Sequence, residues 1–181
     1  MEILDLILLS ILQGVTEFLP VSSSAHLIIL GDLIEAENQG ILFDVSVHLG
    51  TLLAAMIYFQ KEVVEMFKGL SFKETHKEGT VLVINVLVAV CPILVVGFFS
   101  RDLVDIYLRN PLIIACTTII FGVVLYIADQ VKTRSDNLNS ISILQSFLIG
   151  MSQCIALIPG TSRSGITISA ALFLGIRSDV A

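Results

Sequence analysis

Three long runs of apolar residues constrain this chain most, because each is long enough to cross the hydrocarbon core of a membrane. They cover residues 41–59, 80–99 and 112–128. A helix rises about 1.5 Å per residue, so roughly 20 residues span a core of about 30 Å. The composition agrees, since 55% of the residues are apolar, 14% are charged and the mean hydropathy is +0.93. We therefore expect an all-α integral membrane protein.

The remaining apolar segments form two interrupted pairs, residues 3–19 with 25–34 and residues 141–158 with 166–176. The second member of each pair is too short to span a membrane. We expect each pair to be a re-entrant helix–loop–helix, whose loop is tolerated at membrane depth only if protein buries it or it lines a cavity. Residues 1–181 would then form one membrane domain, with pairs at 3–34 and 141–176 flanking three spans within 41–128.

Both interruptions carry polar and ionisable residues. The first reads QGVTEFLPVSSSAH and contains Glu17 and His26, whereas the second reads QCIALIPGTSRSG and contains Arg163. An ionisable residue inside a membrane is costly and marks a functional site by default. A proline in each stretch would break the helix at this point. We therefore expect the two loops to build the site.

The basic residues predict how the chain is oriented. Two connecting segments are rich in lysine and arginine, and a third, which lies between them, has two basic residues. In chain order they carry Lys61, Lys68, Lys73 and Lys77; then Arg101 and Arg109; then Lys132 and Arg134. The basic segments should be cytoplasmic. The N-terminus and residues 31–44 would then lie outside, and the two helix–loop–helix pairs would be inverted relative to each other.

Such an inversion is typical of an internal repeat. Aligning Pro20 with Pro159 gives an offset of 139 residues and places Ser22 opposite Thr161 and Ser23 opposite Ser162. If each unit consists of a pair and three spans, the second unit has its pair but not its spans. We therefore expect this chain to be a C-terminally truncated piece of a longer protein.

The first loop combines a carboxylate with a run of hydroxyls. Ser10, Gln13 and Glu17 have the spacing of one helical face, which would turn an amide and a carboxylate toward the same cavity. The serines at positions 22–24 precede the next helix, whose first turn would contain His26. Serine is a favoured helix N-cap, and a helix N-terminus attracts anions.

The second loop repeats this logic with an added cation. Its candidate phosphate-binding residues are Gly160, Thr161, Ser162, Arg163, Ser164 and Thr167, with Thr167 expected to start the next helix. Arginine presents a fork that matches phosphate oxygens, and glycine permits close approach of the backbone. Two inverted loops with converging helix N-termini predict a pocket for a strongly anionic group, such as a diphosphate.

These residues resemble the signature motifs of the undecaprenyl-diphosphate phosphatases, the bacitracin-resistance family of bacterial inner membranes. The resemblance rests on Gln13 and Glu17, on the Pro-Val-Ser-Ser segment before His26, and on the Pro-Gly-x-Ser-Arg-Ser-x-x-Thr element at residues 159–167. It implies hydrolysis of undecaprenyl diphosphate to the monophosphate carrier lipid of cell-wall synthesis, at a site open to the periplasmic or extracellular side. Gln13 departs from the second glutamate of many relatives, and the C-terminal helices of the family are absent.

The resemblance also suggests residue roles. Ser23 is the leading nucleophile, His26 or Glu17 would accept its proton, and Arg163 would stabilise charge on the transferred phosphoryl group. Direct attack by His26 remains an alternative. We expect Ser22, Ser24 and the residues of the second loop to bind the phosphate groups. The family further implies a divalent cation, Mg²⁺ or Ca²⁺, at Glu17 and Gln13, with water and substrate supplying most ligands.

Other functions remain open at this point. Inverted repeats with broken helices also build secondary transporters, so the same pocket could move a lipid phosphate or another anion instead of cleaving it. A hydroxyl cluster beside a base and an arginine favours an enzyme. The net charge of −6 argues against a nucleic-acid partner, and the partners we expect are a polyprenyl diphosphate and the bilayer, with a homodimer left open. His48 shares a helix face with Asp44 and is as easily a structural contact as a cavity residue.

Overall fold

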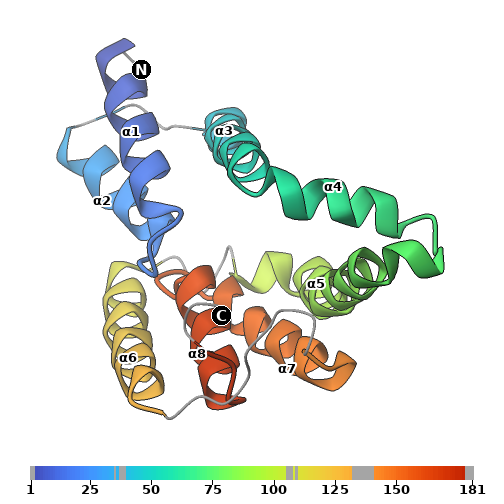
Figure 1. Cartoon of the computed structure of the whole chain (residues 1–181). Coiled ribbons are helices and arrows are strands. Elements are labelled where there is room, and N and C mark those ends of the chain that lie inside the picture. Colours follow the sequence, from blue (N-terminus) through green and yellow to red (C-terminus); the bar gives the residue numbers. More distant parts are fainter. Residues whose placement is uncertain are drawn as a thin grey trace.

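The computed structural model describes residues 3–34, 36, 40–104, 108, 110–131 and 141–177. The regular elements in this part of the chain are helices, which confirms the expected all-α class (Figure 1). In order they are α1 (Ile3–Thr16), α2 (Ser23–Leu33), α3 (Gly40–Tyr58), α4 (Gln60–Gly69), the short 3₁₀ helix η1 (Glu74–His76), α5 (Lys77–Leu103), α6 (Pro111–Asp129), α7 (Ile143–Gln153), the 3₁₀ helix η4 (Cys154–Leu157) and α8 (Arg163–Phe173).

The expected spans correspond to α3, α5 and α6. Helices α5 and α6 are each long and apolar enough to cross a membrane, and α3 makes a third candidate when it is taken together with α4. Pro92 lies within α5, and Asn85 of the same helix donates a hydrogen bond of 3.0 Å to the carbonyl oxygen of Ile141. These two residues therefore do not end the span.

The charged segment after α3 is helical, although the sequence analysis took it as a loop. Lys61 and Lys68 lie in α4, whose axis is bent by 85° from that of α3. Ten residues with mixed apolar and charged side chains form a short amphipathic helix, which a search for long apolar runs overlooks. Arg101 falls in the last turns of α5, while Arg109, Lys132 and Arg134 lie outside the described residues.

The two helix–loop–helix pairs match each other closely, with an offset one residue longer than the prolines indicate. Helices α2 and α8 both have 11 residues, and their N-caps, Ser22 and Ser162, are 140 positions apart. Both caps have extended backbone angles, φ −71° and ψ 102° for Ser22 and φ −67° and ψ 124° for Ser162. The offset of 139 is therefore wrong, because Pro20 lies two residues before its N-cap and Pro159 lies three residues before its own. The helices also begin earlier than expected, so Thr167 lies one turn inside α8.

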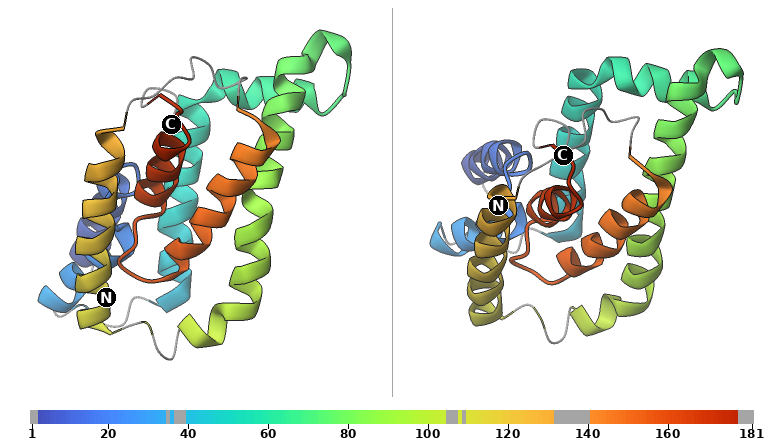
Figure 2. Two further views of the ribbon diagram at one scale, coloured as in Figure 1. Left: turned by 90° about the horizontal axis from the view of Figure 1, so that it is seen from below. Right: turned by 60° about the horizontal axis from the view of Figure 1, so that its bottom comes forward.

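The second pair is packed between two spans. Helix α7 runs along α5, and α8 runs along α6 (Figure 2). A Cβ added to Gly150 of α7 would collide with the carbonyl group of Ala89, so the backbones of α7 and α5 come very close. The first pair packs against α3 instead, around a small buried cluster of Leu9, Leu27 and Phe43. The outer faces of the spans expose many large apolar side chains, as expected for surfaces that contact lipid.

Candidate functional site

Two helix N-termini face the same cavity. The Ser22 hydroxyl accepts a hydrogen bond from the backbone N–H of Ala25, at 3.4 Å, and the Ser162 hydroxyl accepts one from Gly165, at 3.1 Å. Each cap uses the third amide of its helix, and the first two amides have no partner within the helix. These free N–H groups and the positive ends of two helix dipoles favour an anion.

The two loops touch each other although they are far apart in the sequence. The Ser164 hydroxyl donates a hydrogen bond of 2.9 Å to the carbonyl oxygen of Leu19. Ser164 and Ser162 also share a hydrogen bond of 3.1 Å, as Ser24 and Ser22 do at 3.2 Å in the first loop. The expected meeting of the two loops is therefore present, and it brings both serine pairs to one place.

The Glu17 carboxylate accepts two hydrogen bonds from side chains of the first pair. The hydroxyl of Ser23 donates to its Oε2 atom at 2.7 Å, and the side-chain amide of Gln13 donates to the same atom at 2.9 Å. Gln13 is fully buried, whereas Glu17 lines the cavity. A hydroxyl held against a carboxylate is the arrangement that activates serine as a nucleophile, because the carboxylate can accept its proton.

His48 enters the same cavity from α3. Its Nδ1 atom lies 2.7 Å from the carbonyl oxygen of Asp44, and since a carbonyl only accepts, Nδ1 carries a hydrogen. The other ring nitrogen, Nε2, lies 3.9 Å from Oε2 of Glu17. His48 thus faces the carboxylate that holds Ser23, from near the middle of a 19-residue helix.

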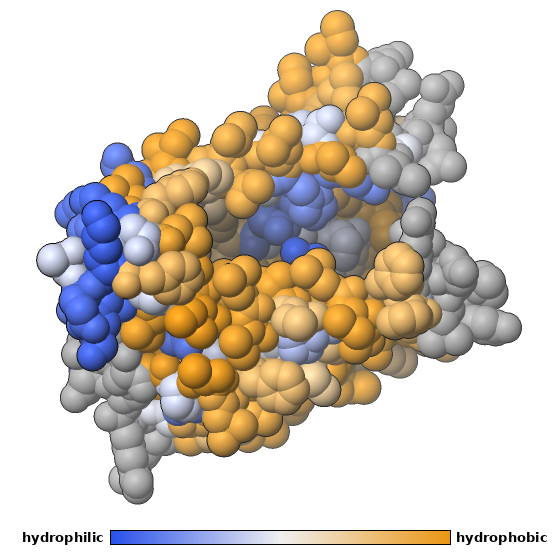
Figure 3. Space-filling view, turned by 90° about the vertical axis from the view of Figure 1, so that its right-hand side faces the viewer, coloured by the Kyte–Doolittle hydropathy of each residue, from blue (hydrophilic) through white to orange (hydrophobic). Residues whose placement is uncertain are grey.

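Together these groups line a cavity of about 280 Å³. Its residues come from the two loops, the adjoining helix ends and α3. They are Glu17, Val21, Ser22, Ser23, Ser24, His48, Gln153, Ala156, Thr161, Ser162, Arg163, Ser164 and Thr167. Among the described residues the Arg163 guanidinium has no hydrogen-bond or ion-pair partner, and the buried hydroxyl of Thr161 has none either. Figure 3 shows polar residues on the floor of a hollow between apolar rims.

Comparison with known proteins agrees with this geometry. Residues 6–181 match the family described as bacitracin resistance protein BacA. The chain belongs to this family. Three similar curated proteins are each named undecaprenyl-diphosphatase. The one from Alteromonas mediterranea is 42% identical over 99% of this chain and 68% of its own length. Those from Teredinibacter turnerae and Saccharophagus degradans are 42% and 44% identical over the whole of this chain and 70% and 69% of their own lengths.

Three residues that the motifs suggested in this BacA-family chain are not among those that line the cavity. The Nδ1 atom of His26 lies 2.7 Å from the carbonyl oxygen of Ser22, within its own loop. Gly160 has a φ of +90° and packs against α6, where a Cβ would collide with the Thr117 hydroxyl. Gln13 lies behind Glu17 and turns its amide hydrogens toward the carboxylate. The roles predicted for these residues remain predictions.

Helix α6 holds the second loop of the BacA motif in place. The Thr117 hydroxyl donates a hydrogen bond of 2.7 Å to the carbonyl oxygen of Pro159, and the Thr118 hydroxyl donates one of 3.1 Å to that of Gly160. Glycine is required at 160, because the positive φ and the close approach to α6 both exclude a side chain. Gly160 therefore supports the loop that carries Thr161 and Arg163.

Two polar residues of the cavity, Gln153 and His48, are not part of the site predicted from the sequence. Gln153 is 140 positions after Gln13, so the repeat could have indicated it once the correct offset was known. His48 lies outside both motifs, and only the packing of α3 brings it to the site.

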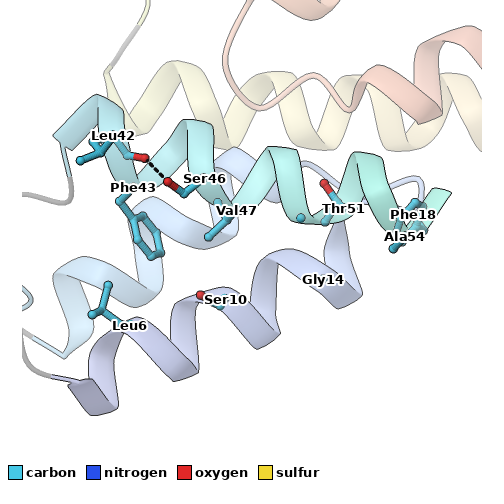
Figure 4. A pocket seen from close by; sticks show the side chains of 11 residues that line it. Leu6, Ser10, Gly14, Phe18, Leu42, Phe43, Ser46, Val47, Thr51 and Ala54 are labelled. Atoms are coloured by element: carbon cyan, nitrogen blue, oxygen red, sulfur yellow. Dashed lines mark hydrogen bonds between the residues drawn. The ribbon is translucent and has the colours of Figure 1, made fainter. Parts of the chain in front are cut away.

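A larger cavity, of about 700 Å³, lies between α1 and α3 (Figure 4). Its lining is mostly apolar and includes Ser10, Gly14 and Phe18 of the first pair.

Proposed function

We propose that this protein hydrolyses undecaprenyl diphosphate to undecaprenyl phosphate and inorganic phosphate. Membership in the BacA family and relatives named undecaprenyl-diphosphatase support this activity. The observation that carries the proposal is the 2.7 Å hydrogen bond from Ser23 to Glu17 in a cavity that Arg163 also lines. A nucleophile, a proton acceptor and a cation within one anion-binding cavity meet the needs of phosphoryl transfer.

In the proposed reaction the Ser23 hydroxyl attacks the terminal phosphorus of the diphosphate. A bond forms between Oγ and phosphorus, the bond from phosphorus to the bridging oxygen breaks, and the lipid monophosphate leaves. Glu17 accepts the proton of the hydroxyl, which it already binds. Water then hydrolyses the phosphoserine and releases inorganic phosphate. We favour Ser23 over His26 as the nucleophile because Ser23 lines the cavity and His26 does not.

Charge stabilisation would come from both loops. Arg163 and the free amides at the starts of α2 and α8 would bind the phosphoryl oxygens as charge develops on them. Ser22, Ser24, Ser162 and Ser164 line the same cavity, so their hydroxyls would add hydrogen-bonding groups around the phosphate. Thr161, with its unpartnered hydroxyl, and Thr167 complete the polar lining.

A divalent cation is part of the proposal, either Mg²⁺ or Ca²⁺. Within the described residues no group of three or more His, Cys, Asp or Glu side chains could hold a metal by itself. The donor set fits a cation shared with substrate, because Mg²⁺ commonly binds through one carboxylate, water and phosphate oxygens. Glu17 would be its protein ligand, and the cation would neutralise charge on the phosphate. Gln13 presents hydrogens toward Glu17, so its carbonyl oxygen would have to turn to reach a cation.

We further propose that the protein lies in the bacterial inner membrane with its cavity open to the periplasmic side. The apolar helices support a multi-pass membrane protein. The four lysines of residues 60–78 favour a cytoplasmic location for the α4 end of α3. His48 lies in the middle of α3, which would place the cavity near the centre of the bilayer.

Phosphate release from a polyprenyl diphosphate tests the function. The complete gene product in detergent should release phosphate, and removal of divalent cations with a chelator should reduce the rate. Adding back Mg²⁺ or Ca²⁺ should restore it. Binding of the diphosphate lipid without release under all these conditions would instead favour the transporter alternative, which the named relatives do not support.

A further inference from the structure

Helix α4 leaves the end of α3 almost at a right angle. Helix α3 ends at Tyr58, and α4 begins at Gln60 with its axis bent by 85°. It then crosses to the start of α5, which is a candidate span (Figure 1). Helix α5 is a candidate span and α3 is an apolar helix of 19 residues, so α4, which runs almost at a right angle between their ends, would lie near the boundary between lipid and water.

The surface of α4 has three parts. One side is packed: Gly69 is buried against α5, and Val63 and Met66 are half-buried. A second side exposes apolar groups, with Val64 48% and Phe67 66% exposed. A third side is charged and carries Lys61, Glu65 and Lys68. A helix with one face packed, one apolar and one charged is suited to lie flat in a membrane interface.

The end of α4 packs closely against α5. The Thr80 hydroxyl donates a hydrogen bond of 2.8 Å to the carbonyl oxygen of Gly69, and a Cβ on Gly69 would collide with the backbone of Gly79. This contact sets how α4 is rotated about its own axis. The exposed apolar side is therefore presented in one direction rather than being free to turn.

The turn after α4 continues the apolar surface. Leu70 is 52% exposed and Phe72 is 69% exposed. Phe72 also has a φ of +52°, a conformation that is costly for a bulky side chain. Its N–H donates a hydrogen bond of 3.0 Å to Gly69, which helps to hold the turn. An aromatic ring held outward at such a cost, next to Leu70, indicates a favourable contact outside the protein.

Charge does not explain an affinity of this segment for a membrane. Residues 60–78 contain four lysines and four glutamates and no arginine or aspartate, so they are formally neutral with His76 uncharged. A segment that binds anionic lipid by charge would instead carry a clear excess of basic residues. The exposed apolar side chains of this segment are therefore the basis for a contact with the membrane.

We propose that α4 and the turn at residues 70–72 lie in the plane of the membrane interface. Val64, Phe67, Leu70 and Phe72 enter the boundary between headgroups and acyl chains, and the charged side of α4 faces water. The partner is the lipid surface, recognised through its apolar boundary and not through headgroup charge. This contact does not depend on the phosphatase activity.

Tryptophan fluorescence can test the proposal directly, because residues 1–181 contain no tryptophan and the protein without an added tryptophan supplies the background emission. A Phe67→Trp variant in phosphatidylcholine vesicles should emit at blue-shifted wavelengths. Bromine atoms near the headgroup end of the acyl chains should quench it more strongly than bromines near the chain ends. The matched control is Lys61→Trp, at an exposed position on the charged side, which should emit as in water and be quenched by aqueous acrylamide. Equal lipid quenching of the two variants, or water-like emission from Phe67→Trp, would overturn the proposal.

Two further measurements keep the test decisive. A Phe72→Trp variant should behave like Phe67→Trp, so the proposal stays testable if either variant does not fold. Adding anionic phosphatidylglycerol to the vesicles should leave the quenching of both variants unchanged. Quenching that requires the anionic lipid would show recognition by charge and would contradict the proposed apolar contact.

Discussion

The two helix–loop–helix pairs have the same local structure but different chemistry and different support. With the offset of 140, Ser23 of the first pair corresponds to Arg163 of the second, and Glu17 corresponds to Leu157. The first loop therefore holds the proposed nucleophile and base, and the second holds the cation. The two pairs share helix N-termini that suit an anion, and the proposed reactive groups are divided between them.

The two pairs also differ in how closely they pack against a neighbouring span. Gly150 of α7 lies against the backbone of α5, whereas Ser10, its counterpart in α1, lines the 700 Å³ cavity between α1 and α3. One face of the second pair is thus in direct contact with a span, whereas the equivalent face of the first pair is separated from α3 by this cavity. Caps therefore set the local form of each loop, and the neighbouring helices set how closely each pair is packed.

The largest predicted effects on phosphate release come from Ser23 and Arg163, which occupy equivalent positions in the two pairs. Ser23→Ala should lower phosphate release by at least about a thousandfold while binding of the diphosphate lipid is largely kept, because only bond formation needs the hydroxyl.

Arg163→Ala should lower release by about a hundredfold to a thousandfold and weaken binding as well. Release rates and lipid binding of the complete gene product would be measured for both variants. More than a tenth of the activity remaining in Ser23→Ala would exclude the serine as nucleophile.

Glu17→Gln should have the next largest effect. The amide keeps the size of the side chain but cannot accept the proton of Ser23, so release should fall by about a hundredfold to ten-thousandfold. Glu65→Gln, which removes a carboxylate from the exposed side of α4, serves as the control and should leave the rate unchanged. Nearly normal activity in Glu17→Gln would mean that another group takes the proton, and His48 would be the next candidate.

Much of the fold could be predicted because it depends on local patterns. The apolar runs indicated α3, α5 and α6 to within a few residues, and the serine caps with their neighbouring prolines marked where each pair is interrupted. Helix α4 was missed because an amphipathic helix of ten residues has neither a long apolar run nor a distinctive cap. Helix α8 begins at Arg163, three residues earlier than expected, because Ser162 caps it.

The site was predictable only where its residues belong to the motifs. Glu17, Ser23 and Arg163 were found because polar residues stand out in apolar sequence, and all three line one cavity. His48 could not be assigned, since its approach to Glu17 depends on how α3 packs against the first pair. His26 and Gly160 stand out equally in the sequence, yet one bonds to its own loop and the other packs on α6. Sequence shows which residues are unusual, and tertiary packing decides which of them meet.

Glycine substitutions test the difference in support. Gly150→Ala should destabilise the protein by about 1–3 kcal/mol, because the added methyl group collides with the backbone of Ala89 and forces α7 away from α5. Gly14→Ala is the matched control in the first pair, since no other group lies within 4 Å of the added carbon. It should be neutral or stabilise by up to about 1 kcal/mol, as alanine favours a helix. Thermal unfolding in detergent would measure both. Equal effects would contradict the tighter support of the second pair.

The smallest effects should come from the caps themselves. Ser22→Ala and Ser162→Ala each remove one hydrogen bond to a helix N-terminus, which is typically worth about 1 kcal/mol. We expect the loss to be larger for Ser162, because its hydroxyl lies 3.1 Å from the amide it caps and that of Ser22 lies 3.4 Å away. The difference should be a few tenths of a kcal/mol, measured by thermal unfolding without substrate so that the role of the cavity does not enter. A larger loss for Ser22→Ala would mean that the second loop depends less on its cap than on the threonines of α6. In that case the support from neighbouring helices, and not the cap, would set the shape of the second loop.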